Sequence, residues 1–235
     1  MSSTPSPPPL SIVMPVLDEA AGIAVALARL QPLRRRGCEV IVVDGGSFDA
    51  TIALATPACD RVAMSPPGRA AQMNAGALVA HGDALLFLHA DTALPVDADR
   101  LVLEALGGTR HVWGRFDVRI AGRPAMLRVI AAMMNLRSRL TAVATGDQAI
   151  FCRRAAFDAV GGFPSQPLME DVEISKRLRR LGPPACLRAR VTTSGRRWEQ
   201  RGVARTVLLM WRLRLAYFLG VDPARLARRY PRHRD

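Results

Sequence analysis

The stretch that decides the fold is Leu85-Leu86-Phe87-Leu88-His89-Ala90-Asp91-Thr92. Its four consecutive apolar residues predict a strand that is buried on both faces, as in a parallel sheet covered by helices. Asp91 follows the end of this strand, and the carboxyl ends of strands are where open α/β sheets bind ligands. A carboxylate at this position can bind a divalent cation, but it can equally cap the next helix. The stretch by itself leaves both roles open.

The chain before this stretch alternates strands with helices. Apolar, β-branched runs at Leu10–Val16 and Glu39–Val43 predict two further buried strands, and Arg61–Met64 predicts a weaker third. Helical patterns follow the strands at 18–30, 50–55, 69–80 and 96–106, the first opening with the acids Asp18 and Glu19. This strand–helix alternation predicts a parallel sheet with right-handed crossovers.

Acidic residues recur at the ends of these strands. Asp44 closes the second strand, and Asp18 and Glu19 follow the first. Carboxylates from several segments are therefore expected at one edge of the sheet, which is the layout of a ligand site. The paired glycines Gly45 and Gly46 allow a ligand to approach the backbone closely. The first strand lacks the G-x-G-x-x-G turn of dinucleotide-binding folds, and its absence argues against a dehydrogenase.

The second half of the chain continues with shorter elements. A half-exposed strand is predicted at 112–120, a long apolar helix at 124–143, a polar turn at 144–148, a strand at 149–152 and a short helix at 154–160. Glu170 and Asp171 open a helix that runs to Leu181. The helix dipole favours acids at this position, and a carboxylate there can also take a proton from a hydroxyl. A last strand is predicted at 186–191, followed by a basic loop at 194–199.

The composition limits the class of protein. The 235 residues, 49% of them hydrophobic, suffice for one sizeable domain. The cysteines Cys38, Cys59, Cys152 and Cys186 are scattered without a C-x-x-C pair, which argues against a zinc knot or a disulfide framework and suits a cytoplasmic protein. Residues 1–9 contain only Met, Ser, Thr, Pro and no basic or long apolar region, so we expect a disordered tail rather than a signal peptide.

Positive charge is concentrated in the second half. Residues 1–117 carry 9 Lys or Arg against 12 Asp or Glu, a net charge of −3, whereas residues 118–235 carry 24 against 8, a net charge of +16. Such a basic half suits an anionic lipid surface, nucleic acid or phosphorylated ligands. Nucleic acid is disfavoured because Lys176 is the only lysine, which indicates a compositional bias, and because no RNA-binding or zinc-finger signature occurs.

A strongly apolar helix is predicted at 202–220, within a C-terminal extension at 201–235. Arg212 and Arg214 lie inside this helix, so it is not expected to span a bilayer. Three arrangements remain open: packing on the domain, pairing with a second subunit in a homodimer, or contact of residues 203–219 with the inner face of a membrane. The last residues, 225–235, are expected to form a solvated basic end.

Five motifs together resemble a known family. The segments SIVMPVLDE, VVDGGSFDAT, RAAQMNAG, FLHADT and MEDVEISKRL are similar, in this order, to those of family-2 glycosyltransferases of the GT-A fold, and the resemblance runs from about Leu10 to Trp198. LHADT, GDQ and RRW most resemble a small bacterial subgroup associated with arsenosugar biosynthesis. The resemblance implies an α/β GT-A fold with a Rossmann-like, mostly parallel central sheet flanked by helices. Residues 10–200 would form this domain, with a nucleotide-binding half at 10–110 and an acceptor half at 111–200.

The resemblance also implies a reaction and a set of site residues. It implies an inverting transferase of the hexosyltransferase type that moves a sugar from a UDP- or GDP-linked donor to an acceptor hydroxyl. Asp171, paired with Glu170, would be the general base. Asp91 would hold Mg²⁺ or Mn²⁺ across the diphosphate, together with His89, which stands where the family's D-x-D motif has its first acid. Nucleotide-sugar binding is implied for Pro15, Val16, Glu19, Asp44, Gly45, Ser47, Arg69, Asn74, His89, Ala90 and Asp91. Contact with the acceptor or the diphosphate is implied for Gly146, Asp147, Gln148, Arg196, Arg197 and Trp198.

Two other functions compete with this interpretation. A basic lipid- or nucleic-acid-binding protein without catalysis would use the second half of the chain and the apolar helix at 203–219. A sugar-phosphate nucleotidylyltransferase would share a related fold, but the glycine-rich loop that such enzymes carry after the first strand is absent here.

Overall fold

The computed structural model describes residues 8–230. The side chains of Arg197, Arg201 and Arg229 are not among the described atoms. The tail predicted at 1–9 lies almost wholly outside the described residues, and so does the end of the basic tail, 231–235.

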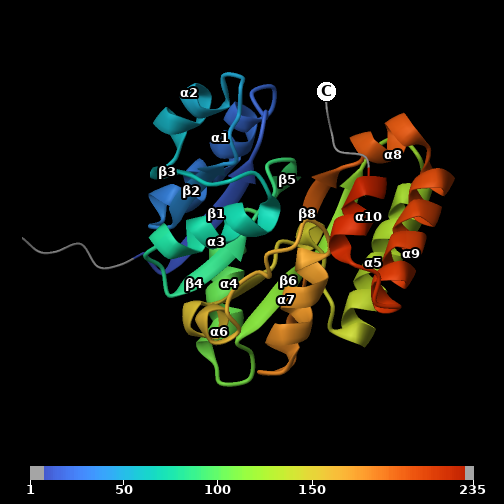
Figure 1. The fold of residues 1–235 in the computed structure, drawn as a ribbon. Helices are drawn as coiled ribbons and strands as arrows, with labels where there is room; N and C mark the ends of the chain where they lie inside the picture. The colour runs from blue at the N-terminus through green and yellow to red at the C-terminus, as the bar shows by residue number, and fades with distance from the viewer. Residues whose placement is uncertain (1–7, 231–235) are drawn as a thin grey trace, which may run out of the picture.

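One eight-stranded sheet runs through the protein, with helices on both faces (Figure 1). The strand order is β3-β2-β1-β4-β7-β6-β8-β5. The strands are β1 (Leu10–Val16), β2 (Glu39–Asp44), β3 (Arg61–Met64), β4 (Ala84–Phe87), β5 (Thr92–Ala93), β6 (Trp113–Ala121), β7 (Phe151–Arg153) and β8 (Ala185–Ser194). The helices are α1 (Ile23–Arg35), α2 (Thr51–Ala55), α3 (Arg69–Val79), α4 (Ala98–Gly107), α5 (Met126–Thr141), α6 (Arg154–Ala159), α7 (Glu170–Arg179), α8 (Arg196–Arg201), α9 (Val203–Phe218) and α10 (Pro223–Arg229). Short 3-10 turns occur at η1 (Thr56–Ala58) and η2 (Gly146–Gln148).

The first half of the sheet is parallel, as the strand–helix alternation predicts. β1 lies between β2 and β4, and β3 pairs with the outer edge of β2. The side chains of β2 and β4 are all buried. The three strands β2, β1 and β4 therefore end at one edge, and their following loops emerge side by side.

The second half of the sheet adds antiparallel pairings to the parallel strands of the first half, so that four of the seven pairings are parallel. β7 is antiparallel to both β4 and β6, and β5 is antiparallel to β8, while β6 and β8 are parallel. The sheet is therefore mixed. Apolar alternation along a strand indicates which face is buried, but it carries no information on strand direction. The α/β class with helices on both faces is confirmed.

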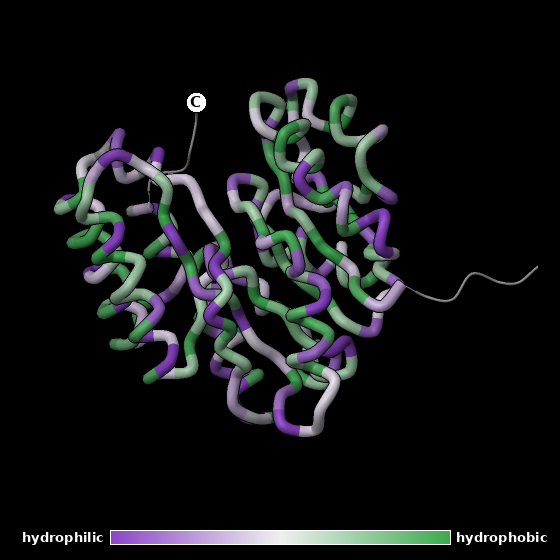
Figure 2. Tube along the Cα trace, turned by 180° about the vertical axis from the view of Figure 1, so that it is seen from behind, coloured by the Kyte–Doolittle hydropathy of each residue, from purple (hydrophilic) through white to green (hydrophobic). Residues whose placement is uncertain are grey.

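Two hydrophobic cores lie between the sheet and its helices. One core contains buried side chains of β1, β6, α1, α4 and α5, and the other contains those of β2, β4, α3, α6 and α7. Gly76 on α3 allows close packing in the second core, because a Cβ atom there would lie 2.3 Å from the Val13 side chain and 2.8 Å from that of Val43. Figure 2 shows the hydrophobic strands in the interior, and further hydrophobic segments on helices at the edge of the molecule.

Three predicted segments differ in the structure. The first helix begins at Ile23, not at Asp18, because Asp18 adopts a positive φ of 52° and the acids occupy a loop. The basic loop predicted at 194–199 is the end of β8 followed by α8. The segment 225–229, expected to be part of a solvated basic end, belongs to α10, which buries Leu226.

The apolar C-terminal helix packs on the domain through one face only. Leu213 of α9 and Leu226 of α10 form a third buried cluster with Val143, Met169 and Val172. Met169 directly precedes α7, so this cluster lies against the first turn of α7. Among the described residues, none of the helices has both the length and the apolar character needed to span a bilayer.

Candidate active site

The loops after β1 and β2 are joined by hydrogen bonds. The Asp18 N–H donates to the Ser47 hydroxyl over 2.9 Å, and the Phe48 N–H donates to the Asp18 carboxylate over 2.8 Å. The Glu19 N–H donates to the Thr51 hydroxyl over 2.8 Å. The two loops thus form one rigid unit at the edge where β1 and β2 end.

Asp44 anchors the second of these loops. Its side chain is completely buried, and its carboxylate accepts the N–H groups of Gly46 at 2.8 Å and Ser47 at 2.9 Å. The Ser47 hydroxyl also donates to this carboxylate. Asp44, Gly45 and Ser47, all predicted to bind the nucleotide, therefore share one tight turn.

Gln72 on α3 is a residue that the sequence analysis did not select. Its buried amide donates to the carbonyls of Val16 at 2.7 Å and Val43 at 2.9 Å, and so ties the ends of β1 and β2 together. Gly45 is required beside it, since a Cβ atom there would lie 3.0 Å from the Gln72 side chain. A polar residue on the buried face of an apolar helix was the available sequence signal.

Asn74, two residues further along α3, has a different environment from the one predicted. Its amide nitrogen donates to the Phe163 carbonyl, and its amide oxygen accepts the Phe163 N–H, each over 2.9 Å. Both polar atoms of the amide therefore bind the loop before α7, and a contact of Asn74 with a nucleotide-sugar stays a prediction.

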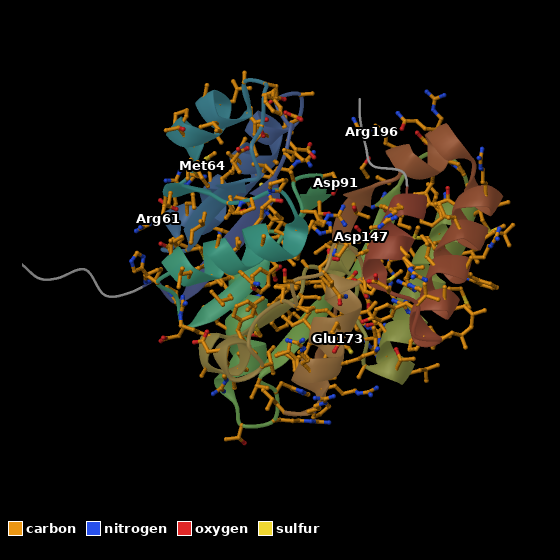
Figure 3. All side chains as sticks on the ribbon, in the orientation of Figure 1. Arg61, Met64, Asp91, Asp147, Glu173 and Arg196 are labelled. Carbon is orange, nitrogen blue, oxygen red and sulfur yellow. The ribbon has the colours of Figure 1, made fainter. Side chains whose placement is uncertain are left out.

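The segment that follows β4 holds His89 and Asp91. β4 ends at Phe87, so these residues lie in a turn before the short strand β5 rather than directly at the strand end. The His89 Nδ1 lies 3.4 Å from the Asp147 carboxylate, and the exposed Asp91 accepts a 3.2 Å hydrogen bond from the Thr92 hydroxyl. Asp91 and Asp147 both lie in the middle of the molecule in Figure 3. The next helix is preceded by Asp97, so Asp91 does not cap it.

The turn at η2 connects His89 to Asp171. A Cβ atom at Gly146 would lie 2.5 Å from the His89 ring, so only glycine lets the ring lie against this turn. The Gly146 N–H donates to one oxygen of the Asp171 carboxylate over 3.0 Å, and the Val172 N–H donates to the other over 2.8 Å. Gln148 closes the turn in a reciprocal capping arrangement with Thr145. Asp171 is thus held in a fixed orientation from both sides.

Glu170 and Arg69 complete the charged cluster. Burial, and then the neighbouring Asp171 charge, raise the pKa of the Glu170 carboxyl. Burial acts to lower the pKa of Arg69, but the carboxylates of Glu170, Asp147 and Asp171 raise it overall. The Arg69 side chain nevertheless remains accessible to solvent. A small cavity is lined by Met73, Phe87, His89, Gly146, Ile150, Phe163, Glu170 and Asp171.

Arg137 on α5 is a second residue that the sequence analysis did not assign to the site. Its Nε and Nη2 atoms are buried and have no hydrogen-bond partner among the residues that the structure describes. Burial lowers the pKa of Arg137, and the nearby Asp171 carboxylate opposes this shift. A buried guanidinium group beside an acid is a candidate contact for an anionic substrate group. Its position among the apolar residues of α5, which also carries Arg128 and Arg139, gave little sequence signal.

The predicted RRW segment lies in α8. Arg196 is exposed at the start of this helix (Figure 3), and its N–H donates to the Ser194 hydroxyl over 3.2 Å. Trp198 is half-buried against the core that contains α5. The side chain of Arg197 lies outside the described part of the chain. The assignment of these residues to the acceptor or the diphosphate stays a prediction.

A metal ion bound here would need further ligands in addition to protein side chains. Within residues 8–230 there is no group of three or more His, Cys, Asp or Glu residues arranged to hold a cation. Mg²⁺ is commonly held by one or two carboxylates together with substrate phosphates and water. The exposed Asp91 carboxylate and the nearby His89 ring fit a metal of this kind, whereas they do not fit a metal enclosed by protein.

The comparisons with known proteins agree with the fold. The mannosyltransferase PcManGT from Pyrobaculum calidifontis, determined with GDP-Man and Mn²⁺, aligns with 98% of this chain and 67% of its own, at 19% identity and a TM-score of 0.66. S. aureus TarS residues 1–349 align with 79% of this chain at 16% identity and a TM-score of 0.64. Glucosyl-3-phosphoglycerate synthase from Mycobacterium tuberculosis, determined with Mg²⁺ and UDP, covers 78% of this chain and 69% of its own, at 21% identity and a TM-score of 0.59. These similarities confirm the predicted fold class.

The chain is shorter than the proteins it resembles, since it spans 60% of the TarS structure. No curated protein matches its sequence. The model of the family "Glycosyl transferase family 2" matches residues 11–160, which contain both joined loops, the His89–Asp91 turn and the Gly146 turn. The chain therefore belongs to glycosyltransferase family 2.

Proposed function

We propose that the protein transfers a sugar from a nucleoside-diphosphate sugar to an acceptor hydroxyl, with inversion at the anomeric carbon. The observation that carries this proposal is the Asp171 carboxylate, which two backbone N–H groups orient beside the cavity that His89 and Glu170 also line. The GDP-Man and UDP complexes of the similar structures support a donor of this class.

Asp171 is the general base in this proposal. An acceptor hydroxyl is a poor nucleophile, and a positioned carboxylate that takes its proton during attack contributes about 10²–10⁴ in rate. The N–H groups of Gly146 and Val172 fix both carboxylate oxygens, so the base need not reorganise during the reaction. Attack from the side opposite the leaving diphosphate inverts the configuration of the sugar.

The joined loops after β1 and β2 hold the donor nucleoside in this proposal. Asp44 and Ser47 form the floor, and Pro15, Val16 and Glu19 flank it. Parallel strands lie about 4.8 Å apart, so the loop after β4 is about 10 Å from the loop after β2. Arg69, at the start of α3, binds the diphosphate in this proposal. Its guanidinium group lies near the Glu170–Asp171 pair at the start of α7.

Asp91, with His89, would hold Mg²⁺ or Mn²⁺. When bound, such an ion neutralises negative charge that develops on the leaving diphosphate. His89 in turn is oriented by Asp147 and by the space that Gly146 leaves. Gln148 shapes the turn that carries Gly146 and Asp147 on the acceptor side. Hexosyl transfer, and an acceptor related to the LHADT subgroup linked to arsenosugar biosynthesis, are the finer proposals within this function.

The experiment that tests the donor assignment is a thermal-shift panel of UDP, GDP, UDP-glucose and GDP-mannose, each with and without Mn²⁺. A ligand at a hundred times its Kd adds about 2.7 kcal/mol to the free energy of unfolding. This corresponds to roughly 5–10 °C in melting temperature for a chain of this size. We expect one nucleotide series to stabilise the protein, and more so with Mn²⁺. Stabilisation by none of them contradicts the donor site. With the active donor, NMR of the product then reads the anomeric configuration, and retention contradicts the role of Asp171.

A further inference from the structure

Helix α5 carries an apolar stripe that is more than half exposed in the described part of the chain. Its residues recur at alternating intervals of three and four, so they share one face of the helix. The buried side chains Leu127 and Ala131 lie on the other face, against the sheet. The members of the stripe are between 51% and 77% exposed: Met126, Val129, Met133, Leu136 and Leu140.

Helix α9 carries a second stripe of the same kind. Leu208, Trp211, Leu215 and Phe218 follow the same spacing and are 60–68% exposed, whereas the buried Leu213 faces the domain. Figures 1 and 2 show α5 and α9 on the same side of the molecule, away from α1 and α2. Monomeric proteins rarely expose many large apolar side chains in one region, so two such stripes on the same side of the molecule indicate a binding surface. We call these two stripes the α5–α9 face.

The charges around this face select its partner. Exposed Arg128 on α5 and exposed Arg205 and Arg212 on α9 accompany the stripes. The sequences of α5 and α9 contain no Asp or Glu at all. A second copy of the chain would bring arginines against arginines, which is repulsive. An anionic surface attracts them instead.

We propose that the α5–α9 face docks on a lipid bilayer with anionic headgroups. Leu, Met, Phe and Trp side chains enter the boundary between headgroups and acyl chains, while arginine side chains extend to the phosphates. The helices lie on the membrane and do not cross it, in agreement with their length. The inner side of α9 packs against Met169 and Val172, on either side of the Glu170–Asp171 pair, so the docked cleft is held near the lipid surface. This inference concerns binding and is independent of the proposed reaction.

The test measures sedimentation of the full chain with phosphatidylcholine vesicles, with and without phosphatidylglycerol, over a salt series. We expect binding only to the anionic vesicles, weakening as salt rises. Tryptophan emission should shift to the blue on binding, because Trp211 is 68% exposed and Trp113 is fully buried. The double variant Trp211→Ala/Leu215→Ala should weaken binding by about tenfold or more. Arg205→Gln and Arg212→Gln should each weaken it about fivefold.

Matched controls lie on the opposite side of the molecule. Leu78→Ala removes an exposed leucine from α3, and Arg29→Gln removes an exposed arginine from α1, and both should bind as the wild type does. Circular dichroism and melting temperature check that every variant is folded. The inference is overturned if the protein does not sediment with anionic vesicles at low salt, or if the controls weaken binding as much as the face variants do. It is also overturned if light scattering shows a dimer that the Trp211→Ala/Leu215→Ala variant dissociates, since a second copy then occupies the face.

Discussion

The acids in the loops after β1 and β2 and those at the start of α7 have opposite electrostatic environments. In the loops after β1 and β2, carboxylates accept hydrogen bonds that stabilise their charged form. At Asp49, the hydrogen bond from the Thr51 hydroxyl, followed by those from backbone N–H groups, lowers the pKa. At the start of α7 the situation is reversed, because burial and the Asp171 charge raise the pKa of Glu170. The folded protein therefore stabilises the charged form of Asp49, whereas ionisation of Glu170 costs free energy in the folded state. Such a cost is typical of a site selected for chemistry.

The arginines show the same contrast. In the first half Arg34 pairs with Asp60 over 2.6 Å, and Arg36 pairs with Asp99 over 2.7 Å. Arg137 in the second half has two buried nitrogen atoms without a partner among the described residues. Paired groups secure a fold, whereas a buried guanidinium group without a protein partner suits a ligand that brings its own negative charge.

The largest effect is expected from substitution of Asp171, the proposed general base. Asp171→Asn removes the base but keeps the size of the side chain, so kcat should fall by about 10²–10⁴ while donor affinity changes little. Steady-state kinetics with the active donor measure this separation. Glu173→Gln, on the same helix and outside the cavity lining, is the matched control and should keep kcat. Wild-type turnover in Asp171→Asn shows that another group takes the proton.

A second prediction concerns the contact between the turn at η2 and His89. Gly146→Ala places a Cβ atom 2.5 Å from the His89 ring, so the ring or the turn must move. We expect a loss of about tenfold in kcat/KM and a raised Mn²⁺ requirement, with overpacking costing about 1–3 kcal/mol of stability. A Mn²⁺ titration of activity and a melting curve measure the two effects separately.

Gly107→Ala is the control for this substitution. A Cβ atom at Gly107 would meet nothing within 4 Å, and this glycine ends α4. It should leave both activity and melting temperature close to the wild type. An unchanged Mn²⁺ requirement in Gly146→Ala would show that His89 does not bind the metal.

A third prediction distinguishes Asn74, which holds a loop, from Ser47, which is proposed to lie at the donor site. Asn74→Ala leaves the Phe163 N–H and carbonyl without partners, which should cost about 1–3 kcal/mol of stability, or roughly 2–12 °C in melting temperature. The KM for the donor should stay the same. Ser47→Ala should instead raise the donor KM, because Ser47 joins Asp18 to Asp44 at the proposed nucleoside floor. A raised donor KM in Asn74→Ala would show that this residue also contacts the donor.

The smallest expected effect concerns pH. Because the folded-state pKa of Glu170 is raised, its contribution to stability is fully present below its ordinary pKa of 4.5 and is lost as pH rises through the folded value. Glu170→Gln should therefore melt at a higher temperature than the wild type at pH 8, with the difference shrinking toward pH 4.5. Asp49→Asn should be less stable than the wild type throughout this range, since the pKa of Asp49 is lowered. Melting curves at several pH values compare the two variants with the wild type. If the melting temperatures of both variants change with pH in the same way, the two acids do not have opposite environments.

Much of the donor side could be predicted from the sequence. Apolar runs ending in Val16, Val43 and Leu88 indicated parallel strands with acids beyond them, because a buried parallel strand is recognisable from its own residues. The Glu170–Asp171 pair was also placed correctly at a helix start. The roles of Gln72, Asn74 and Arg137 escaped, because each depends on a partner 29 or more residues away or on burial that no local pattern reports.

The sequence by itself determined the α/β class, the parallel half of the sheet and the acids at its edge, since these follow from the residues of single segments. Only the tertiary structure decided the directions of β7 and β5, because alternation marks the buried face of a strand and not its direction. It also decided that Gly146 and Asp171, 25 residues apart, would share a hydrogen bond, and that α5 and α9 would both leave an apolar stripe uncovered. Contacts of this kind depend on how separate segments pack together, and packing is a property of the whole chain.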